Sequence, residues 1–254
     1  MRIDSTRPLL ALFAHPDDEF AVFPWIEAAV ASKRIVHCAW ITDGGWGGQD
    51  VARRRHESIR VLASLGVSTD CMHFLGERFD IRDGELHCAT HRAGLVLDEL
   101  ATQLPHGAEW LIPAWEGGHQ DHDALHLLAI SCAERFAADL YQYPLYNGAG
   151  LPGPWFRVLH ALPRNGRQLP IETPILQRLS CVVRCFRYRS QWKSFVGLLP
   201  FYALAMLRRH PFVLQTVIAD RANKRPHEGK VLYERRGGPS WETVRAAVAL
   251  RSSH

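Results

Sequence analysis

The feature that most constrains the fold is a short apolar run that ends abruptly in a polar cluster. Residues 9–13 read Leu-Leu-Ala-Leu-Phe, and residues 14–19 read Ala-His-Pro-Asp-Asp-Glu. Five apolar residues are too few for a buried helix and suit a strand that is covered on both faces, as in parallel sheets. Ligands of open α/β sheets bind beyond the carboxyl ends of such strands, so the sequence predicts a site directly after this strand.

Up to residue 146 the chain alternates between strand-like and helical segments. Apolar runs predict further strands at 35–41, 71–75, 109–113 and 139–146. Helical spacing predicts helices at 20–32, 51–65, 92–104 and 121–138. This alternation favours right-handed crossovers and a Rossmann-like α/β fold, with a mostly parallel sheet and helices on both faces.

Beyond residue 147 the alternation gives way to loops rich in glycine and proline, followed by a helical portion rich in arginine and aromatic residues. We expect a short strand at 229–235 and a closing helix at 241–250. No hydrophilic linker interrupts the chain, so we expect one domain over residues 1–254. Its core would span about 8–147, and substrate-side loops and a C-terminal extension would span about 148–254.

Charge and cysteine usage argue against several classes of protein. Lys and Arg number 30 and Asp and Glu 26, which gives a net charge of +4 without a long basic run. We therefore expect no nucleic-acid partner. The six cysteines form no Cys-x-x-Cys pair and are typical of buried free thiols. No secretory signal is apparent, which favours a cytoplasmic location.

Residues 195–207 form the one segment that raises the question of a membrane. This run is shorter than the roughly 20 residues of a transmembrane helix and contains a proline, so we expect no span. It could line a groove as a helix, or it could touch lipid or a lipophilic substrate with help from Lys193, Arg208 and Arg209. Trp192, just before this run, is expected in the core.

A second polar cluster follows the predicted strand at 109–113 and opens a long helix. Residues 116–123 read Glu-Gly-Gly-His-Gln-Asp-His-Asp. His119 and His122 are three residues apart and so project to similar sides of a first helical turn, while the paired glycines allow a close approach. Because both clusters follow strands of one parallel sheet, we expect them to meet at the same edge.

Imidazole and carboxylate groups in this arrangement suit a divalent metal. Catalytic zinc typically keeps three protein ligands and one open position for water. The predicted ligands are His15, Asp18 and His122. Asp17 would then take a proton from the water, and His119 would assist the oxyanion or the leaving group. In the alternative interpretation, these residues only cap a helix or occupy solvated turns.

The two clusters resemble the paired signature of the LmbE-like or PIG-L zinc-dependent N-deacetylases (GlcNAc-PI de-N-acetylase-like), which remove acetyl groups from amino-sugar conjugates. Other segments are similar to further motifs of this family. Residues 42–44 match its second-strand turn, Arg54 and Glu57 match its Arg-x-x-Glu helix, and residues 188–191 match its Tyr-x-Ser-Gln. The resemblance covers roughly residues 8 to 191.

The resemblance implies zinc, with iron as the alternative, on His15, Asp18 and His122. The other residues that it implies are Asp17 as the general base, His119 for the tetrahedral intermediate, Asp121 to orient and charge-tune a histidine, and Arg54 for the sugar or its anionic group. The implied reaction is hydrolysis of an N-acetylglucosamine-type sugar or sugar conjugate to acetate and a free amine.

The chain also departs from the family pattern at several positions. Residues 20–25 carry bulk where many members have small glycines, and Gln120 replaces a common proline. Gly117 stands where some members have a tyrosine. If a tyrosine contributes to the oxyanion site, Tyr143 and Tyr146 are the candidates.

Two other functions stay open at this stage. The same zinc site could serve a hydratase or lyase that acts on a small unsaturated acid, and the chain could be a non-catalytic glycan- or lipid-binding protein. Trp155 and Phe156 suggest an aromatic surround, which suits an amino-sugar conjugate with a lipophilic aglycone. The sequence makes no prediction of the oligomeric state.

Overall fold

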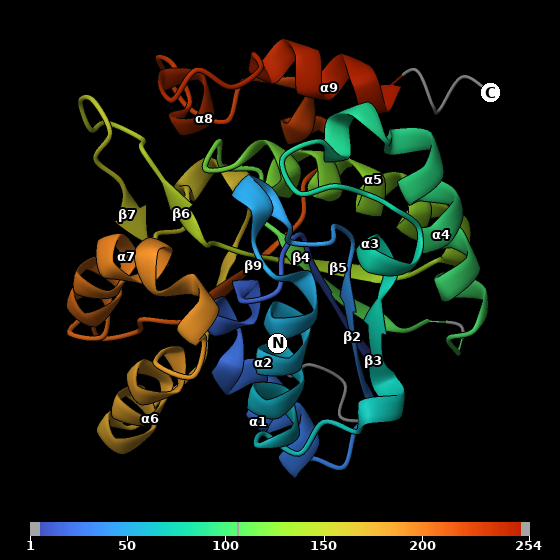
Figure 1. Ribbon diagram of the computed structural model, residues 1–254, viewed down its shortest axis with the longest axis vertical. Coiled ribbons are helices and arrows are strands. Elements are labelled where there is room, and N and C mark those ends of the chain that lie inside the picture. Colours follow the sequence, from blue (N-terminus) through green and yellow to red (C-terminus); the bar gives the residue numbers. More distant parts are fainter. Residues whose placement is uncertain (1–5, 106, 250–254) are drawn as a thin grey trace.

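A seven-stranded sheet forms the centre of the computed structural model, which describes residues 6–105 and 107–249 (Figure 1). Its parallel strands are β1 (Leu9–Phe13), β2 (Val36–Trp40), β3 (Met72–Phe74), β4 (Glu109–Pro113) and β5 (Asp139–Tyr143). Two antiparallel strands, β9 (Val213–Thr216) and β8 (Gln168–Pro170), extend the β5 edge. The order is β3-β2-β1-β4-β5-β9-β8, which confirms the predicted α/β fold with a mostly parallel sheet.

Helices cover both faces of the sheet. The helices of one face are α1 (Phe23–Ala31), α2 (Val51–Ala63), α6 (Ile175–Cys185) and α7 (Trp192–Ala205). Those of the other face are α4 (Thr90–Thr102), α5 (Gln120–Phe136) and α9 (Trp241–Ala249). Alternate residues of β1 belong to the two hydrophobic cores, Phe13 to the first and Leu12 to the second, because successive side chains of a strand point to opposite faces.

The remaining elements are short. They are the helices α3 (Leu75–Arg78) and α8 (Leu232–Arg235), a separate pair of strands β6 (Tyr146–Asn147) and β7 (Arg157–Val158), and the 3₁₀ turns η1 (Asp18–Ala21), η2 (Trp46–Gly48), η3 (Thr69–Cys71), η4 (Leu86–Cys88), η5 (Pro163–Asn165), η6 (Arg189–Gln191) and η7 (Ala219–Asn223). In Figure 1, α6 and α7 lie at the lower left and α8 and α9 cross the top of the molecule.

The early elements lie close to the predicted ranges. The strand at 9–13 and the strand at 109–113 agree residue for residue with β1 and β4. The helix predicted at 20–32 begins later, at Phe23, after the turn η1. Pro24 falls in its first turn, where the missing N–H would have no intrahelical partner in any case.

The C-terminal part differs from the predictions. The strand expected at 229–235 is wrong, because residues 232–235 form α8, where Glu234 accepts a hydrogen bond from the backbone N–H of Val231 at 3.1 Å. The strands β8 and β9 were not predicted, since β9 pairs with β5 and β8 with β9, and each partner lies far away along the chain. Leu250, at the end of the predicted closing helix, lies outside the described residues.

The sheet order places a change of direction between β1 and β4. From β1 the chain moves to β2 and β3 on one side, and then returns to form β4 on the other side of β1. The loops after these two strands therefore diverge and leave a crevice between them, which is the usual place for a ligand in such folds. Both predicted polar clusters begin at this crevice.

Two predictions from composition can be compared with the structure. All six cysteines are free, and the four that are fully buried include Cys181 and Cys185 on the inner side of α6. Among residues 6–105 and 107–249, no helix has both the length and the apolar character needed to cross a bilayer.

Gly76 provides a test of the packing on the β2 side of the crevice. A Cβ atom at Gly76 would overlap the backbone of Thr42, which opens the loop after β2. We expect Gly76→Ala to lower the free energy of unfolding by about 3 kcal/mol. Gly197→Ala in α7 is the control, since its Cβ would meet no atom within 4 Å and should stabilise the helix by up to about 1 kcal/mol. Equal denaturant midpoints for the two variants would contradict the packing described here.

Candidate functional site

The two polar clusters predicted from the sequence meet in the crevice between β1 and β4. The ring centroids of His15 and His119 are 4.7 Å apart, and those of His15 and His122 are 5.2 Å apart. The rings of His119 and His122 are separated by 5.3 Å. Three imidazoles from two loops about a hundred residues apart in sequence thus form one group, as expected from strands of one parallel sheet.

The predicted metal ligands His15, Asp18 and His122 have converging donor atoms. One potential ligand atom from each lies within 4.8 Å of the other two, and all three residues are buried. His122 Nε2 is 3.1 Å from Asp18 Oδ1, and His15 Nδ1 is 3.4 Å from Asp18 Oδ2. Two imidazole nitrogens and one carboxylate form an established zinc donor set, so the residues present fit a divalent metal.

Asp121 holds His15 from the side opposite to this donor group. Its buried carboxylate accepts hydrogen bonds from the backbone N–H of Gly84 at 2.6 Å and Leu86 at 3.1 Å, and His15 Nε2 lies 3.0 Å away. With Nε2 as the donor to this carboxylate, Nδ1 of His15 keeps its lone pair toward Asp18. The geometry therefore fits the orienting duty implied for Asp121, and the histidine concerned is His15.

The charges around His15 also favour a cation. Burial by itself lowers the pKa of His15, but the carboxylates of Asp83 and Asp18 outweigh it and raise the pKa well above the ordinary value. Burial opposes the charge on Asp18 as well, yet His122 and His15 hold its pKa well below the usual range. An excess of carboxylates around one imidazole requires a positive charge, which a divalent metal can supply instead of a proton.

Asp83 is a member of the site that the sequence analysis missed. Its Oδ1 lies 3.1 Å from His15 Nε2, and its Oδ2 lies 3.3 Å from a guanidinium nitrogen of Arg54. With His15 and His119 it forms a second group of potential metal donors. The only signal in the sequence is the dipeptide Asp83-Gly84, which is typical of a turn and does not by itself indicate a site.

Asp17 is held in an unusual backbone conformation at the wall of the site. Its φ of 119° lies in a region that residues other than glycine rarely adopt. The backbone N–H of Asp17 donates to Glu19 Oε2 at 2.9 Å, and Asp17 Oδ1 lies 3.4 Å from the guanidinium of Arg54. Burial raises the pKa of Asp17 to about 8, although Arg54 acts in the opposite direction. Such strain is common where a side chain must be held for function.

Arg54 is buried, and its guanidinium is engaged inside the protein. It donates to the carbonyl oxygens of Pro16 at 2.7 Å and of Gly44, and it forms ion pairs with Asp17 and Asp83. These contacts join the loop after β1 to the loop after β2. The predicted contact of Arg54 with a substrate stays a prediction, while the described contacts give it a role in holding Asp17.

His119 caps the N-terminus of α5 with its side chain. Its Nδ1 accepts a hydrogen bond from the backbone N–H of Asp121 at 3.2 Å. Burial, assisted by the positive charge of His15, lowers the pKa of His119 to about 4, so the ring is neutral near pH 7. Because Nδ1 is the acceptor, the ring proton of neutral His119 is on Nε2, and this N–H can donate a hydrogen bond.

The two candidate tyrosines have different environments. The hydroxyl of Tyr143 is buried and donates to the carbonyl oxygen of Leu12 at 2.7 Å, outside the pocket. Tyr146 lines the pocket, and its ring centroid lies 5.6 Å from that of His122. Glu116 accepts the backbone N–H of Tyr146 at 2.9 Å, which positions this residue. Tyr146 is therefore the tyrosine that stands beside the metal-donor group.

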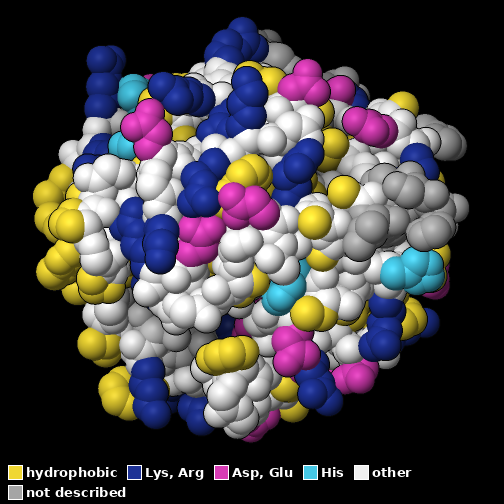
Figure 2. Space-filling view, turned by 90° about the horizontal axis from the view of Figure 1, so that it is seen from above, with side chains coloured by type: hydrophobic (Ala, Val, Ile, Leu, Met, Phe, Trp, Pro, Cys, Tyr) yellow, Lys and Arg dark blue, Asp and Glu magenta, His cyan; other side chains and the backbone are white. Residues whose placement is uncertain are grey.

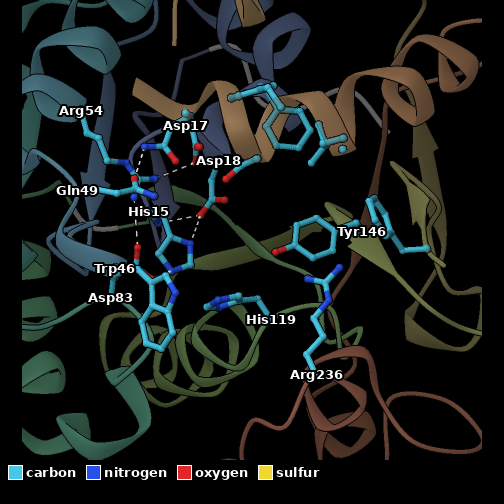
Figure 3. A pocket seen from close by; sticks show the side chains of 17 residues that line it. His15, Asp17, Asp18, Trp46, Gln49, Arg54, Asp83, His119, Tyr146 and Arg236 are labelled. Atoms are coloured by element: carbon cyan, nitrogen blue, oxygen red, sulfur yellow. Dashed lines mark hydrogen bonds and ion pairs between the residues drawn. The ribbon is translucent and has the colours of Figure 1, made fainter. Parts of the chain in front are cut away.

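The site lies in a pocket of about 390 Å³, a size suited to a sugar. Figure 3 shows Arg54, Asp17 and Asp18 at the upper left, His15 and His119 below them, and Tyr146 and Arg236 to the right. Apolar side chains complete the wall, and they include Phe20, Phe156, Phe195 and Leu198. Phe20, from the bulky stretch at 20–25, is thus one of the residues that line the pocket.

The C-terminal motif at 188–191 supports the site from behind. The hydroxyl of Tyr188 donates to Glu19 Oε1 at 2.8 Å, and Glu19 in turn holds the backbone of Asp17. The hydroxyl of Ser190 donates to Glu57 Oε2 at 2.6 Å, which ties the motif to α2. The motif is thus joined by direct hydrogen bonds to the loop after β1 and to α2.

Comparison with protein families gives a match over residues 10–133 to a family described as PIG-L: GlcNAc-PI de-N-acetylase. This match confirms the resemblance found in the sequence, and it contains both polar clusters. No significant match was found among curated proteins.

Several solved structures share the fold at low sequence identity. A deacetylase of the teicoplanin biosynthetic pathway has 18% identity and a TM-score of 0.63, with 83% of this chain and 98% of that chain covered. A deacetylase of an antimicrobial pseudoaglycone has 20% identity and a TM-score of 0.61, with coverages of 85% and 98%. The N,N'-diacetylchitobiose deacetylase from Pyrococcus horikoshii has 18% identity and a TM-score of 0.54, with 84% of this chain and 83% of that chain covered. At these identities the likeness establishes the fold.

Tyr188→Phe tests whether the motif at 188–191 supports the loop after β1. Removing this hydroxyl leaves one oxygen of buried Glu19 without its donor, so we expect the free energy of unfolding to fall by about 1–3 kcal/mol. Tyr202→Phe is the matched control, because the hydroxyl of Tyr202 donates to a neutral carbonyl oxygen at 3.1 Å and its loss should cost about 1 kcal/mol or less. Chemical denaturation of both variants gives the comparison, and a larger loss for Tyr202→Phe would speak against this role of Tyr188.

Proposed function

Starting from the match of residues 10–133 to the PIG-L family, we propose that this protein is a metal-dependent hydrolase that removes an N-acetyl group from an amino sugar or its conjugate. The observation that carries the proposal is the convergence of His15, Asp18 and His122 next to Asp17 in one pocket. The products would be acetate and a free amine. We further propose that residues 1–254 form one functional unit, since elements from both ends of the chain share the two cores.

The proposed metal ligands are His15, Asp18 and His122, with zinc as the first candidate and iron as the alternative. A divalent metal bound there would supply Lewis-acid polarisation of the amide carbonyl and of the attacking water. The tautomer of His15 that Asp121 favours supports this assignment. Asp121 is therefore proposed as the residue that orients a ligand, as the family resemblance implied.

The chain's own residues supply the proton transfers and part of the oxyanion site. Asp17 is proposed to take the proton of the attacking water, since it lies in the pocket and its raised pKa suits a base working near neutral pH. His119 is proposed to donate its Nε2–H to the oxyanion of the tetrahedral intermediate. As a neutral donor it needs no proton uptake beforehand.

The substrate class is proposed from the walls of the pocket. The phenol of Tyr146 and the ring of Phe156 offer faces and edges for a pyranose, and their centroids are 5.7 Å apart. Arg236 holds its guanidinium 5.7 Å over the ring of Phe156 and brings a positive charge to the pocket entrance. The structural relatives are a deacetylase of teicoplanin biosynthesis and a diacetylchitobiose deacetylase, which supports an N-acetylated sugar conjugate as the substrate.

Asp17→Asn tests the proposed general base. The variant keeps the shape and the left-handed backbone that asparagine tolerates, so the metal should stay bound while acetate release falls by about 10²–10⁴-fold. Asp80→Asn is the matched control, because Asp80 also has a positive φ but is exposed and outside the pocket. Acetate is measured with a panel of N-acetylated sugar conjugates. Full turnover by Asp17→Asn would remove the assignment.

His122→Ala tests the metal site in the same preparation. The protein should lose bound zinc on dialysis, as measured by elemental analysis, because one of three ligands is gone. His126→Ala is the control, since His126 lies one turn further along α5 and is bound to the carbonyl oxygen of Pro113 instead. Unchanged zinc content in His122→Ala would count against its role as a ligand.

Asp121→Asn tests the orientation of His15. We expect the zinc affinity, measured by competition with a chelator, to fall by about 10–100-fold while the fold is kept. Asp70→Asn, at an exposed position, should leave the zinc affinity unchanged.

The alternative functions are distinguished with the unaltered protein. Turnover without acetate release would favour the lyase alternative, and a metal-loaded protein with no turnover on any substrate would favour a binding protein.

A further inference from the structure

The outer side of α7 is an apolar stripe. Trp192, Val196 and Leu204 of α7 and Leu207 just after it have exposed fractions of 60%, 65%, 61% and 78%. Their positions follow the spacing of one helix face. The expectation that Trp192 is a core residue is therefore wrong, because its side of the helix faces outward and nothing in the described part of the chain covers it. The opposite side of α7 carries Phe195, which is buried and lines the pocket.

The neighbouring helix α6 also has apolar side chains on its outward side. Leu176, Leu179 and Val183 are exposed by 77%, 55% and 63%, and Phe186 just after the helix is exposed by 64%. The side toward the core carries the buried Cys181 instead. Figure 2 shows hydrophobic side chains gathered along the left edge of the molecule, on the side where α6 and α7 lie in Figure 1. We call these exposed residues of α6 and α7 the apolar face.

The segment that carries the apolar face is rich in basic residues. Residues 173–219 contain seven Lys or Arg residues and no Asp or Glu. Several of the cations are exposed beside the face, namely Arg187, Arg189, Lys193 and Arg209. The whole protein carries only +4, so this segment is far more basic than the rest of the chain. An apolar stripe with basic flanks is the pattern of helices that lie in the interface of an anionic membrane.

We propose that α6 and α7 dock this protein onto the surface of an anionic lipid bilayer. The apolar face would enter the headgroup boundary, and the flanking cations would contact lipid phosphates. A second copy of the chain fits less well, because two identical faces would bring the exposed cations Arg187, Arg189, Lys193 and Arg209 of both copies together. Since α7 separates the pocket from this surface, docking would bring the pocket next to the bilayer. The inference extends the proposed function but does not depend on it.

Vesicle binding tests the proposal without any assay of catalysis. The whole protein is sedimented with vesicles of phosphatidylcholine, either alone or mixed with phosphatidylglycerol. We expect strong binding to the mixed vesicles, and binding at least about tenfold weaker to phosphatidylcholine alone or to mixed vesicles in about 1 M salt. Absence of binding to the mixed vesicles at low salt would overturn the proposal.

Substitutions assign the binding to the apolar face. The double variant Leu204→Glu with Leu207→Glu should bind mixed vesicles at least about tenfold more weakly, because two apolar side chains that would enter the headgroup boundary become charged. Leu95→Glu is the matched control, since Leu95 is 55% exposed but lies on α4. The control should bind as the unaltered protein does, and thermal unfolding should show that all variants are folded. Equal binding by the double variant and the control would overturn the proposal.

A second variant keeps the test decisive if the first does not fold. Arg187→Glu with Lys193→Glu changes only exposed charges and should weaken binding to the mixed vesicles by at least about tenfold. Light scattering after size exclusion adds an independent check. A dimer that the Leu204→Glu, Leu207→Glu variant dissociates would assign the apolar face to a second copy and overturn the lipid proposal.

Discussion

The contact between the buried carboxylate of Asp121 and His15 is the interaction on which the rest of the site depends. Asp121 accepts two backbone N–H groups from residues 84–86 and has His15 Nε2 at 3.0 Å, so it joins three loops at one point. A carboxylate without solvent is costly unless such donors surround it. Because the donors are present, one side chain fixes the loop after β1, the start of α5 and the tautomer of His15.

The C-terminal half of the chain completes the site by satisfying other buried acids. Glu19 accepts a hydrogen bond from the hydroxyl of Tyr188. Glu57 accepts hydrogen bonds from the backbone N–H and the hydroxyl of Ser190. At the other loop, Gly117 has a positive φ and lies so close to Val231 that a Cβ atom would clash with it. The first half therefore contains the proposed catalytic groups, while the second half supplies the donors and the packing that hold them.

Helix α7 has two apolar sides, which explains its unusual composition. Phe195 and Leu198 line the pocket, whereas Trp192, Val196 and Leu204 face outward. A helix that covers a core on one side normally has polar residues on the other. The absence of acids from 173–219 gives this side of the molecule a character distinct from that of the catalytic core.

The sequence by itself determined the central strands and the two polar clusters. Five-residue apolar runs such as 9–13 and 109–113 leave few alternatives to a buried strand, and clusters at their carboxyl ends must come together if the sheet is parallel. For the same reason, the site around His15 and His122 could be anticipated from local patterns together with one rule of topology.

Only the tertiary structure decided the remaining features. Asp83 enters the site from a turn that has no pattern of its own, and Tyr146 was separated from Tyr143 only by where the two side chains point. Strand β9 exists because β5 offers an edge to it, and Trp192 on the outward side of α7 is exposed although we expected it in the core. In each case the feature depends on residues that lie far away along the chain, or on whether any other element covers the side chain. A local sequence pattern contains neither kind of information.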